Sequence, residues 1–274
     1  MFYVNEEKCI GCGVCVSDCP LQLITIAENK KASIINETCM KCGHCLAVCP
    51  SEAISTDDYD MNEVKTYHEE DFSISPEHLL DFIKSRRSVR HFKNQPVEKE
   101  KLEKIIEAGR FTASGTNSQD VSYTVITDKL AEIKDMAYAG LLQKSDYIYA
   151  TTTEDNDGAR RYADMLSKFY QAYKNDPEHN DPLFNHAPAA IIVTASNPVN
   201  AALASSNMEL MIHACGLGGF FNGFFVFATE GNPALLNTLN IPTGKFIITC
   251  LMVGYKDVDY LRTVPRKAAD ITWL

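Results

Sequence analysis

The chain has 274 residues, of which 45% are hydrophobic and 23% charged, and its formal net charge is -10. These values are ordinary for a globular protein with a hydrophobic core. An acidic chain argues against a nucleic-acid partner, because phosphate backbones are bound by clustered lysine and arginine. No apolar run reaches the roughly 20 residues of a membrane helix, and the N-terminus lacks the pattern of a signal peptide. We therefore expect a cytoplasmic protein without a membrane partner.

Two cysteine runs, CIGCGVCVSDCP and CMKCGHCLAVCP, begin at Cys9 and Cys39 and hold eight of the ten cysteines. Their shared spacing, C-x2-C-x2-C-x3-C-P, is typical of bacterial ferredoxins with two [4Fe-4S] clusters, in which the fourth cysteine binds the other cluster. Zinc is the alternative, but zinc motifs usually pair two C-x-x-C halves across a long spacer. The spacing predicts a two-cluster ferredoxin-like domain over residues 1–56. One cluster would be bound by Cys9, Cys12, Cys15 and Cys49, and the other by Cys39, Cys42, Cys45 and Cys19.

An acidic segment over residues 57–75 has seven Asp or Glu residues against one lysine, and we interpret it as a solvated linker. Ser75 and Pro76 then resemble the cap and first residue of a helix. Helices are predicted over 75–88, 99–111, 158–175 and 197–216, the last a long helix of buried character closed by Gly216. Strands are predicted over 122–128, 189–196 and 245–255. Helices that flank separated strands indicate an α+β domain over residues 76–274.

The second domain lacks a nucleotide fingerprint in its sequence. GLGGFFNG at 216–223 does not have the G-x-G-x-x-G spacing and follows a helix, and IPTGKFI lacks two elements of a P-loop. Arginines and serines instead gather in SRRSVRHF at residues 85–92, and such side chains bind phosphate well. Taken alone, this octet is equally compatible with a solvated basic helix end that the helix dipole favours.

Three further segments accompany the octet: TASGTNSQ at 112–119, GFFNGF at 219–224 and VPRK at 264–267. As an ordered set they resemble the nitroreductase family of FMN enzymes, whose members carry RRSxRxF, an S-x-x-N-x-Q loop and C-terminal basic residues. The resemblance implies a central, mostly antiparallel sheet flanked by helices, and a homodimer with FMN at its interface. It implies that FMN is held by Arg86, Arg87, Ser88, Arg90, Asn222, Gly223, Arg266 and Lys267 and, from the partner chain, by Ser114 and Asn117.

Two positions depart from the family pattern. Asp120 and Val121 stand where members often have Pro-Trp, and Lys256 follows Gly-Tyr where many members have proline. Four aromatic residues lie on one predicted helix, and two roles are open for them: they line a substrate pocket or they pack in the core. They are Tyr162, Phe169, Tyr170 and Tyr173.

The leading hypothesis is an FMN-dependent oxidoreductase that passes electrons from two [4Fe-4S] clusters to FMN. An electron-poor small molecule such as a nitroaromatic or a quinone would accept them, and reduced ferredoxin or a similar low-potential protein would be the donor. No acid–base pair or nucleophile triad stands out, so the chemistry is expected from FMN itself. The alternatives are dehalogenation, ene reduction or flavin fragmentation by an FMN enzyme, and a non-catalytic electron carrier or redox sensor.

Overall fold

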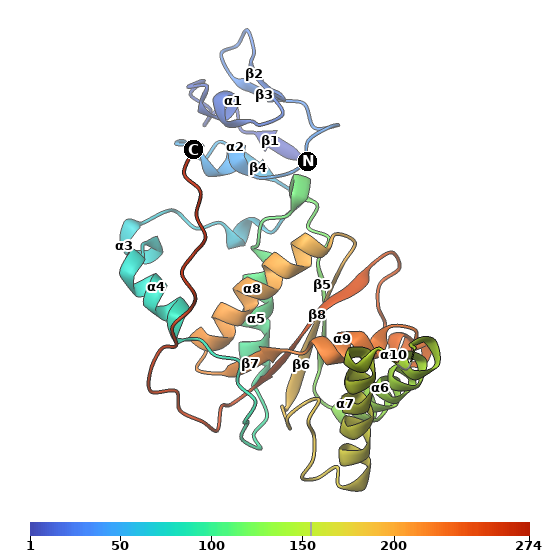
Figure 1. Ribbon diagram of the computed structural model, residues 1–274. Coiled ribbons are helices and arrows are strands. Elements are labelled where there is room, and N and C mark those ends of the chain that lie inside the picture. The colour runs from blue at the N-terminus through green and yellow to red at the C-terminus, as the bar shows by residue number, and fades with distance from the viewer. Residues whose placement is uncertain (154) are drawn as a thin grey trace. The chain divides into compact units, whose positions relative to one another are not determined.

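The computed structural model describes residues 1–153 and 155–274, which form two compact units (Figure 1). Unit 1 comprises Met1–Ile74 together with Gly115–Ser118. Unit 2 comprises Ser75–Ser114 and Gln119–Leu274. Within the described ranges, no helix has both the length and the apolar character needed to cross a membrane.

Unit 1 repeats one small pattern, as its sequence does. Each cysteine run leads into a short helix, and each helix is followed by a strand of a two-stranded antiparallel sheet. The helices are α1 (Val14–Asp18) and α2 (His44–Ala47), and the strand pairs are β1 (Phe2–Val4) with β4 (Ile54–Thr56) and β2 (Ile24–Ile26) with β3 (Ala32–Ile34). The small core contains few large side chains, so the cysteines themselves are part of it.

The acidic segment after residue 56 has little regular structure. It contains one 3-10 turn, η1 (Met61–Glu63), and one short helix, α3 (Glu69–Phe72). Every residue from 59 to 75 is exposed to solvent. Such a segment contributes little buried surface, in keeping with its low content of apolar residues.

Unit 2 is built around a four-stranded sheet with the strand order β5-β6-β8-β7, in which every neighbouring pair is antiparallel. Its strands are β5 (Ser122–Ile126), β6 (Ala189–Ala195), β7 (Gly218–Phe221) and β8 (Phe246–Gly254). Its helices are α4 (Pro76–Ser85), α5 (Lys99–Arg110), α6 (Leu130–Thr151), α7 (Asp157–Asn175), α8 (Pro198–Ala214), α9 (Gly223–Thr229) and α10 (Pro233–Thr238). The predicted α+β architecture, with an antiparallel sheet flanked by helices, is confirmed.

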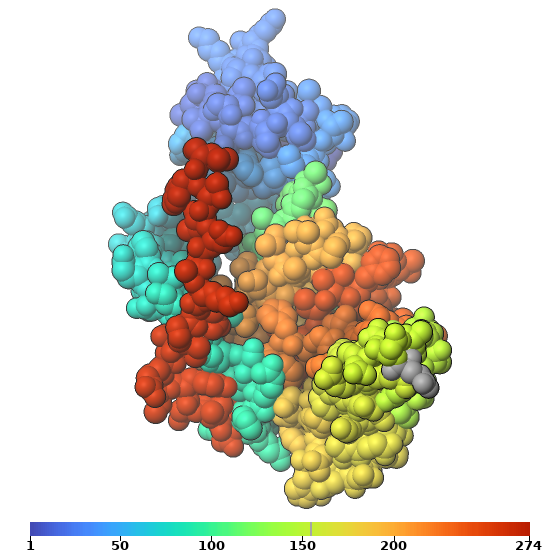
Figure 2. Space-filling view, in the orientation of Figure 1, coloured from blue at the N-terminus to red at the C-terminus, as the bar shows by residue number. Residues whose placement is uncertain are grey.

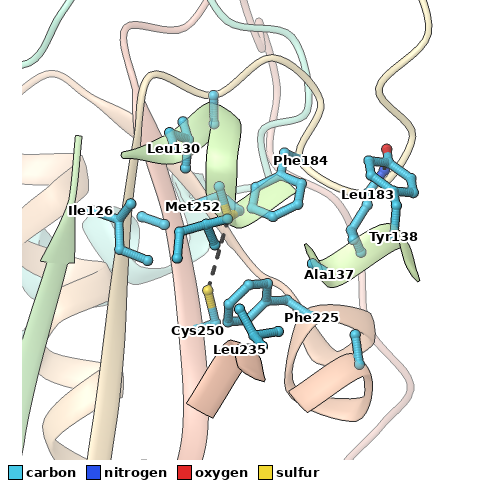
Figure 3. Close-up of a cluster of buried hydrophobic side chains, with 14 of the residues drawn as sticks. Ile126, Leu130, Ala137, Tyr138, Leu183, Phe184, Phe225, Leu235, Cys250 and Met252 are labelled. Atoms are coloured by element: carbon cyan, nitrogen blue, oxygen red, sulfur yellow. Dashed lines mark hydrogen bonds between the residues drawn. The ribbon is translucent and has the colours of Figure 1, made fainter. Parts of the chain in front are cut away.

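The two central strands divide the core of unit 2 into two layers, because successive side chains of a strand point to opposite faces. On β8, Cys250 and Met252 pack with residues of α6, α7, α9 and α10, whereas Leu251 and Val253 pack with residues of α5 and α8. Figure 1 shows these two groups of helices on opposite sides of the sheet. Figure 3 shows the first layer, in which the thiol of Cys250 points toward the sulfur of Met252, 3.9 Å away. Burial raises the pKa of this thiol, so Cys250 stays a neutral core residue.

Capping residues that can be recognised in the sequence determine where helix α4 begins and where helix α8 ends. The hydroxyl of Ser75 accepts a hydrogen bond from the backbone N–H of His78 at 3.1 Å and caps α4, with Pro76 at the first helical position. At the end of α8, Gly216 adopts a positive φ of 72°, and Leu217 donates to the carbonyl of Ile212 at 3.0 Å. This is the glycine-terminated helix end that the sequence predicts.

The C-terminal segment lies outside these layers. From residue 255 onward the chain contains no helix or strand among its named elements, and every residue from 259 to 274 is exposed (Figure 2). Leu261 and Trp273 are about as exposed as free side chains, with exposed fractions of 90% and 88%. Arg266 and Lys267 belong to this extended segment.

Candidate functional site

Four cysteines of unit 1 line a single cavity. They are Cys9, Cys12 and Cys15 from the first run and Cys49 from the end of the second run. This set is the one predicted for one cluster. It brings Cys49 together with cysteines that stand at least 34 positions earlier in the sequence. All ten cysteines carry free thiols. The cavity therefore has four thiols and no disulfide, as the ligation of a [4Fe-4S] cluster requires.

Backbone N–H groups point at the sulfur atoms in equivalent places of the repeat. Leu23 donates to the sulfur of Cys19 at 3.4 Å, and Ala53 donates to the sulfur of Cys49 at 3.2 Å. Further contacts of this kind run from Ala32 to Cys9 at 3.5 Å and from Lys41 to Cys39 at 3.4 Å. Such donors stabilise thiolates, and hydrogen bonds to sulfur are a means of setting cluster potential.

Glycines shape the loops around these sulfur atoms. Gly13 and Gly43, which precede α1 and α2, have positive φ values of 79° and 76°. Gly11 has a φ of 66°, and a Cβ there would lie 2.1 Å from the carbonyl oxygen of Lys30. A side chain at this position would push the first loop away from the chain that packs against it.

In unit 2, the arginine-rich segment lies against the edge strand β7. Ser88 forms a parallel bridge with Gly219, and the N–H of Val89 donates to the carbonyl of Gly219 at 3.0 Å. A Cβ on Gly218 would lie 2.6 Å from the side chain of Val89, so only glycine permits this approach. The glycines of GLGGFFNG therefore hold the arginine segment in place.

Arg86 and Arg87 line a cavity together with Lys256 and Tyr260. Arg86 forms an ion pair with Glu209 of α8. Across the described part of the chain, the buried Nε of Arg86 and the buried Nε and Nη2 of Arg87 have no hydrogen-bond partner. Buried guanidinium nitrogens are normally paired, so these donors fit an anion that completes the site.

His213 closes one side of the same cavity. Its Nε2 lies 2.9 Å from the hydroxyl of Ser85, and its ring packs 4.8 Å from the ring of Phe82. Burial lowers the pKa of His213, and the positive charges of Lys256 and Arg86 lower it further. The imidazole is therefore neutral near pH 7 and adds no charge to the three cations.

Arg90 lies in a different place from Arg86 and Arg87. It lines a cleft of about 520 Å³ with Phe220, Asn222 and Gly223. Its guanidinium carbon is 5.3 Å from the centre of the Phe220 ring. The structure thus assigns the predicted residues Arg90, Asn222 and Gly223 to one cleft, and Arg86 and Arg87 to another cavity.

The side chain of Asn222 has a structural task. Its oxygen accepts from the N–H of Phe225 at 3.0 Å and caps α9, and its amide donates to the carbonyl of Leu183 at 2.8 Å. Gly223 next to it is exposed, and a Cβ there would meet nothing within 4 Å. The side chain of Asn222 is thus engaged within the fold, and the backbone contact with FMN that the resemblance implies stays a prediction.

The remaining predicted residues are spread over both units. In unit 2, the hydroxyl of Ser114 accepts from the N–H of Gln119 at 2.9 Å. In unit 1, the amide of Asn117 donates to the carbonyls of Met40 and Lys41 at 3.1 and 2.9 Å. In the part of unit 2 that the structure describes, Arg266 and Lys267 are not among the residues that line the cavity around Arg87.

Comparison with known proteins identifies both parts of the chain. Residues 83–255 match the model of the nitroreductase family, and residues 3–56 match the model of the 4Fe-4S dicluster domain. The chain belongs to the nitroreductase family. The predicted fusion of a two-cluster ferredoxin domain with a nitroreductase domain is confirmed.

Individual relatives are distant. An FMN reductase [NAD(P)H] from Bacillus subtilis (strain 168) is 26% identical over 180 residues, and the match spans 65% of each chain. A nitroreductase with bound FMN from Bacteroides fragilis has a TM-score of 0.56 at 22% identity, covering 72% of this chain and 98% of its own. A BluB-like flavoprotein from Clostridium difficile 630 has a TM-score of 0.53 at 21% identity, covering 72% and 96%. At such identities the structural matches show a shared fold.

Sequence reasoning missed Lys256 as a site residue. Lys256 stands two residues after the end of β8 and lines the cavity of Arg86 and Arg87. The signal was its departure from the Gly-Tyr-Pro pattern, which replaces an uncharged residue by a cation. The sequence also gave no indication that Glu209 of α8 pairs with Arg86, because 123 positions separate them.

Proposed function

We propose that the protein is an FMN-dependent iron–sulfur oxidoreductase. It takes electrons from a low-potential donor such as reduced ferredoxin and delivers them to an electron-poor acceptor such as a nitroaromatic or a quinone. The domain boundaries proposed are 1–56 for the ferredoxin domain, 57–75 for the linker and 76–274 for the FMN domain. We propose a cytoplasmic homodimer that binds FMN at its interface and binds neither nucleic acid nor a membrane.

The observation that carries this proposal is three buried guanidinium nitrogens that have no hydrogen-bond partner over residues 1–153 and 155–274. They are Nε of Arg86 and Nε and Nη2 of Arg87, and both arginines line a cavity that Lys256 also lines. These donors fit a phosphate monoester, because guanidinium groups bind phosphate oxygens through parallel hydrogen bonds. Membership in the nitroreductase family and the FMN bound in a structurally similar nitroreductase support FMN as the source of this phosphate.

The chain's own residues would hold the two cofactors in the following way. Arg86, Arg87 and Lys256 neutralise the phosphate, Arg90 lies at the ring edge, and the backbone at Gly223 faces the ring. Ser88, Ser114, Asn117, Asn222, Arg266 and Lys267 complete the proposed set. The two cysteine sets of unit 1 hold two [4Fe-4S] clusters. Bound FMN would supply two-electron reduction, and bound clusters would supply single electrons.

Purification under anaerobic conditions tests this proposal directly. We expect about one FMN and about eight iron and eight sulfide per chain. The flavin should be reduced by reduced ferredoxin and reoxidised by a nitroaromatic or a quinone. Protein that contains iron and sulfide but neither contains nor binds FMN would contradict the proposal. Reoxidation by partner proteins alone would instead favour an electron carrier.

The phosphate site has its own test. Arg87→Met and Lys256→Met should each weaken FMN binding by about 30-fold, because each removes a charge-assisted hydrogen bond of about 2 kcal/mol. Affinity for riboflavin, which has no phosphate, should stay the same in both variants. Lys84→Met is the matched control, since Lys84 is an exposed cation on α4 that does not line the cavity. Equal losses for FMN and riboflavin would place the phosphate elsewhere.

A further inference from the structure

The cleft that contains Arg90 continues into a second, polar cleft. The first has a volume of about 520 Å³ and the second about 570 Å³. Four residues line both: Arg90, Phe169, Pro182 and Asn185. Each volume lies in the range of about 300–1,000 Å³ that is usual for small-molecule sites. Together the two clefts offer room for a molecule larger than a single ring.

The first cleft has an aromatic wall formed by α7 and α9. The ring of Phe169 meets the ring of Phe224 edge to face at 5.6 Å, and Tyr162 stacks on Phe224 at 6.1 Å. These rings are partly exposed toward the cleft, whereas Tyr173 on the same helix is buried against Tyr138. Because aromatic faces and edges pack well against other rings, this part of the site suits a planar aromatic group.

The second cleft is lined by two cations, Arg90 and Lys168. Over residues 1–153 and 155–274, neither of them forms an ion pair. The imidazoles of His91, His179 and His186 add further hydrogen-bonding groups to its wall. A guanidinium group and an ammonium group that share one cleft attract an anion.

Asp181 and Asp257 also line the second cleft, but their negative charges do not offset the positive charges of Arg90 and Lys168. Asp181 is fully buried, and its oxygens are bound by the ammonium of Lys134 at 2.5 Å and the hydroxyl of Tyr138 at 2.8 Å. The charge of Asp181 is therefore already paired with that of Lys134. Asp257 is exposed and leaves the cleft with one negative charge against two positive ones. The second cleft is thus net positive even with neutral histidines.

We propose that this site takes an aromatic acceptor that carries an anionic substituent, such as a carboxylate. The acceptor ring shares the aromatic cleft with the FMN ring that the proposed function puts beside Arg90 and Gly223, and the anion lies in the second cleft between Arg90 and Lys168. The inference rests on the proposed function, since it concerns the acceptor of that same reaction. It narrows the acceptor from electron-poor aromatics in general to those that bear a negative charge beyond the ring.

A pair of acceptors with the same ring tests the inference. 4-Nitrobenzoate and its methyl ester differ in charge at one substituent. The purified full chain, loaded with its cofactors, should show a Kd and a KM about 10-fold lower for the carboxylate, as expected for two partly exposed charge pairs. Because salt screens such pairs, 0.5 M NaCl should reduce this preference and leave the ester unaffected.

Two lysines of α7 provide variant and control. Lys168→Met should lower the preference for the carboxylate about fivefold. Lys174→Met removes a charge from the same helix at a position that lines neither cleft, and should leave the preference unchanged. Equal Kd values for the two compounds, or a preference that Lys168→Met does not alter, would overturn the inference.

The outcomes separate this inference from the proposed function. Reduction of both compounds at equal KM would reject the anionic acceptor and leave the oxidoreductase intact. Protein that binds no FMN would reject the oxidoreductase. In that case calorimetry with 4-nitrobenzoate, its ester and the two lysine variants still measures whether the second cleft selects an anion.

Discussion

Asp120 is a residue whose role follows from its contacts rather than from its family. Its carboxylate accepts hydrogen bonds from the hydroxyl and N–H of Ser196 at 2.6 and 3.0 Å, from the N–H of Asn197 at 3.0 Å, and from the amide of Asn200 at 2.6 Å. It thereby ties the start of β5 to the turn between β6 and α8. Burial alone would raise the pKa of Asp120, but these hydrogen bonds outweigh it and hold the pKa well below the usual value.

Replacement of Asp120 should therefore destabilise unit 2. Asp120→Ala leaves several donors without their acceptor and should cost about 2 kcal/mol, which lowers the melting temperature by about 5 °C. Because the pKa is lowered in the folded state, the charge stabilises the fold above about pH 4, and this contribution is lost as the pH falls further.

Thermal melting followed by circular dichroism at pH 7 and pH 3 measures this effect. The difference between wild type and Asp120→Ala should be large at pH 7 and smaller at pH 3. Asp146→Ala is the control, since Asp146 is an exposed acid on α6 whose carboxylate forms no hydrogen bond or ion pair with residues 1–153 or 155–274. A difference that is the same at both pH values would show that the carboxylate charge is not what stabilises the turn.

At the scale of elements, residues 86–90 pack against strand β7, and Gly218, the first residue of β7, permits this close packing. A Cβ on Gly218 would lie 2.6 to 2.8 Å from three atoms of Val89, which is 4% exposed and cannot move into solvent without loss of packing. Gly218→Ala should therefore displace residues 86–90, destabilise unit 2 by about 1–3 kcal/mol and weaken FMN binding.

A double variant checks that the clash is the cause. Val89→Gly removes the Cβ and both Cγ atoms that a Cβ at position 218 would meet, so Gly218→Ala combined with Val89→Gly should bind FMN better than Gly218→Ala alone. Gly158→Ala on α7 is a neutral control, because its Cβ would make only an ordinary contact of 3.8 Å. Absence of rescue in the double variant would argue against this packing as the determinant.

Elements with a strong local signal were predicted well. The helices α4, α5, α7 and α8 and the strands β5, β6 and β8 agree with the predicted segments to within a few residues. The long helix α6 was missed, because its apolar residues are not confined to its buried face: Tyr147 and Tyr149 are exposed, whereas Leu130 and Leu141 are buried. Periodicity does not reveal a helix whose apolar residues lie on several sides.

The candidate site was predictable where its residues are contiguous in sequence. Arg86 and Arg87 do line one cavity, as their neighbouring positions suggest. The separation of Arg90 from them was not predictable, because an extended segment turns successive side chains in different directions. The second cleft was also missed, since Lys168, His186 and Asp257 come from three distant segments.

For the whole molecule, the proposed crossed ligation of the two cysteine runs would make residues 1–56 one folding unit. Cys49 shares a cavity with Cys9, Cys12 and Cys15, although it lies in the other run. Neither run could then hold a cluster by itself, and loss of a single ligand should affect the cluster that begins in the opposite run. Iron content can distinguish this arrangement from one in which each run binds its own cluster.

Pairs of cysteine substitutions make that distinction. With crossed ligation, Cys19→Ser and Cys39→Ser remove ligands of one cluster, so the double variant should keep about four of the eight iron atoms, like each single variant. Cys19→Ser combined with Cys9→Ser removes ligands of both clusters and should leave almost no iron. Uncrossed ligation predicts the reverse for the two pairs. Cys215→Ser, outside both runs, should retain all the iron, because any loss there would reflect general unfolding rather than ligation.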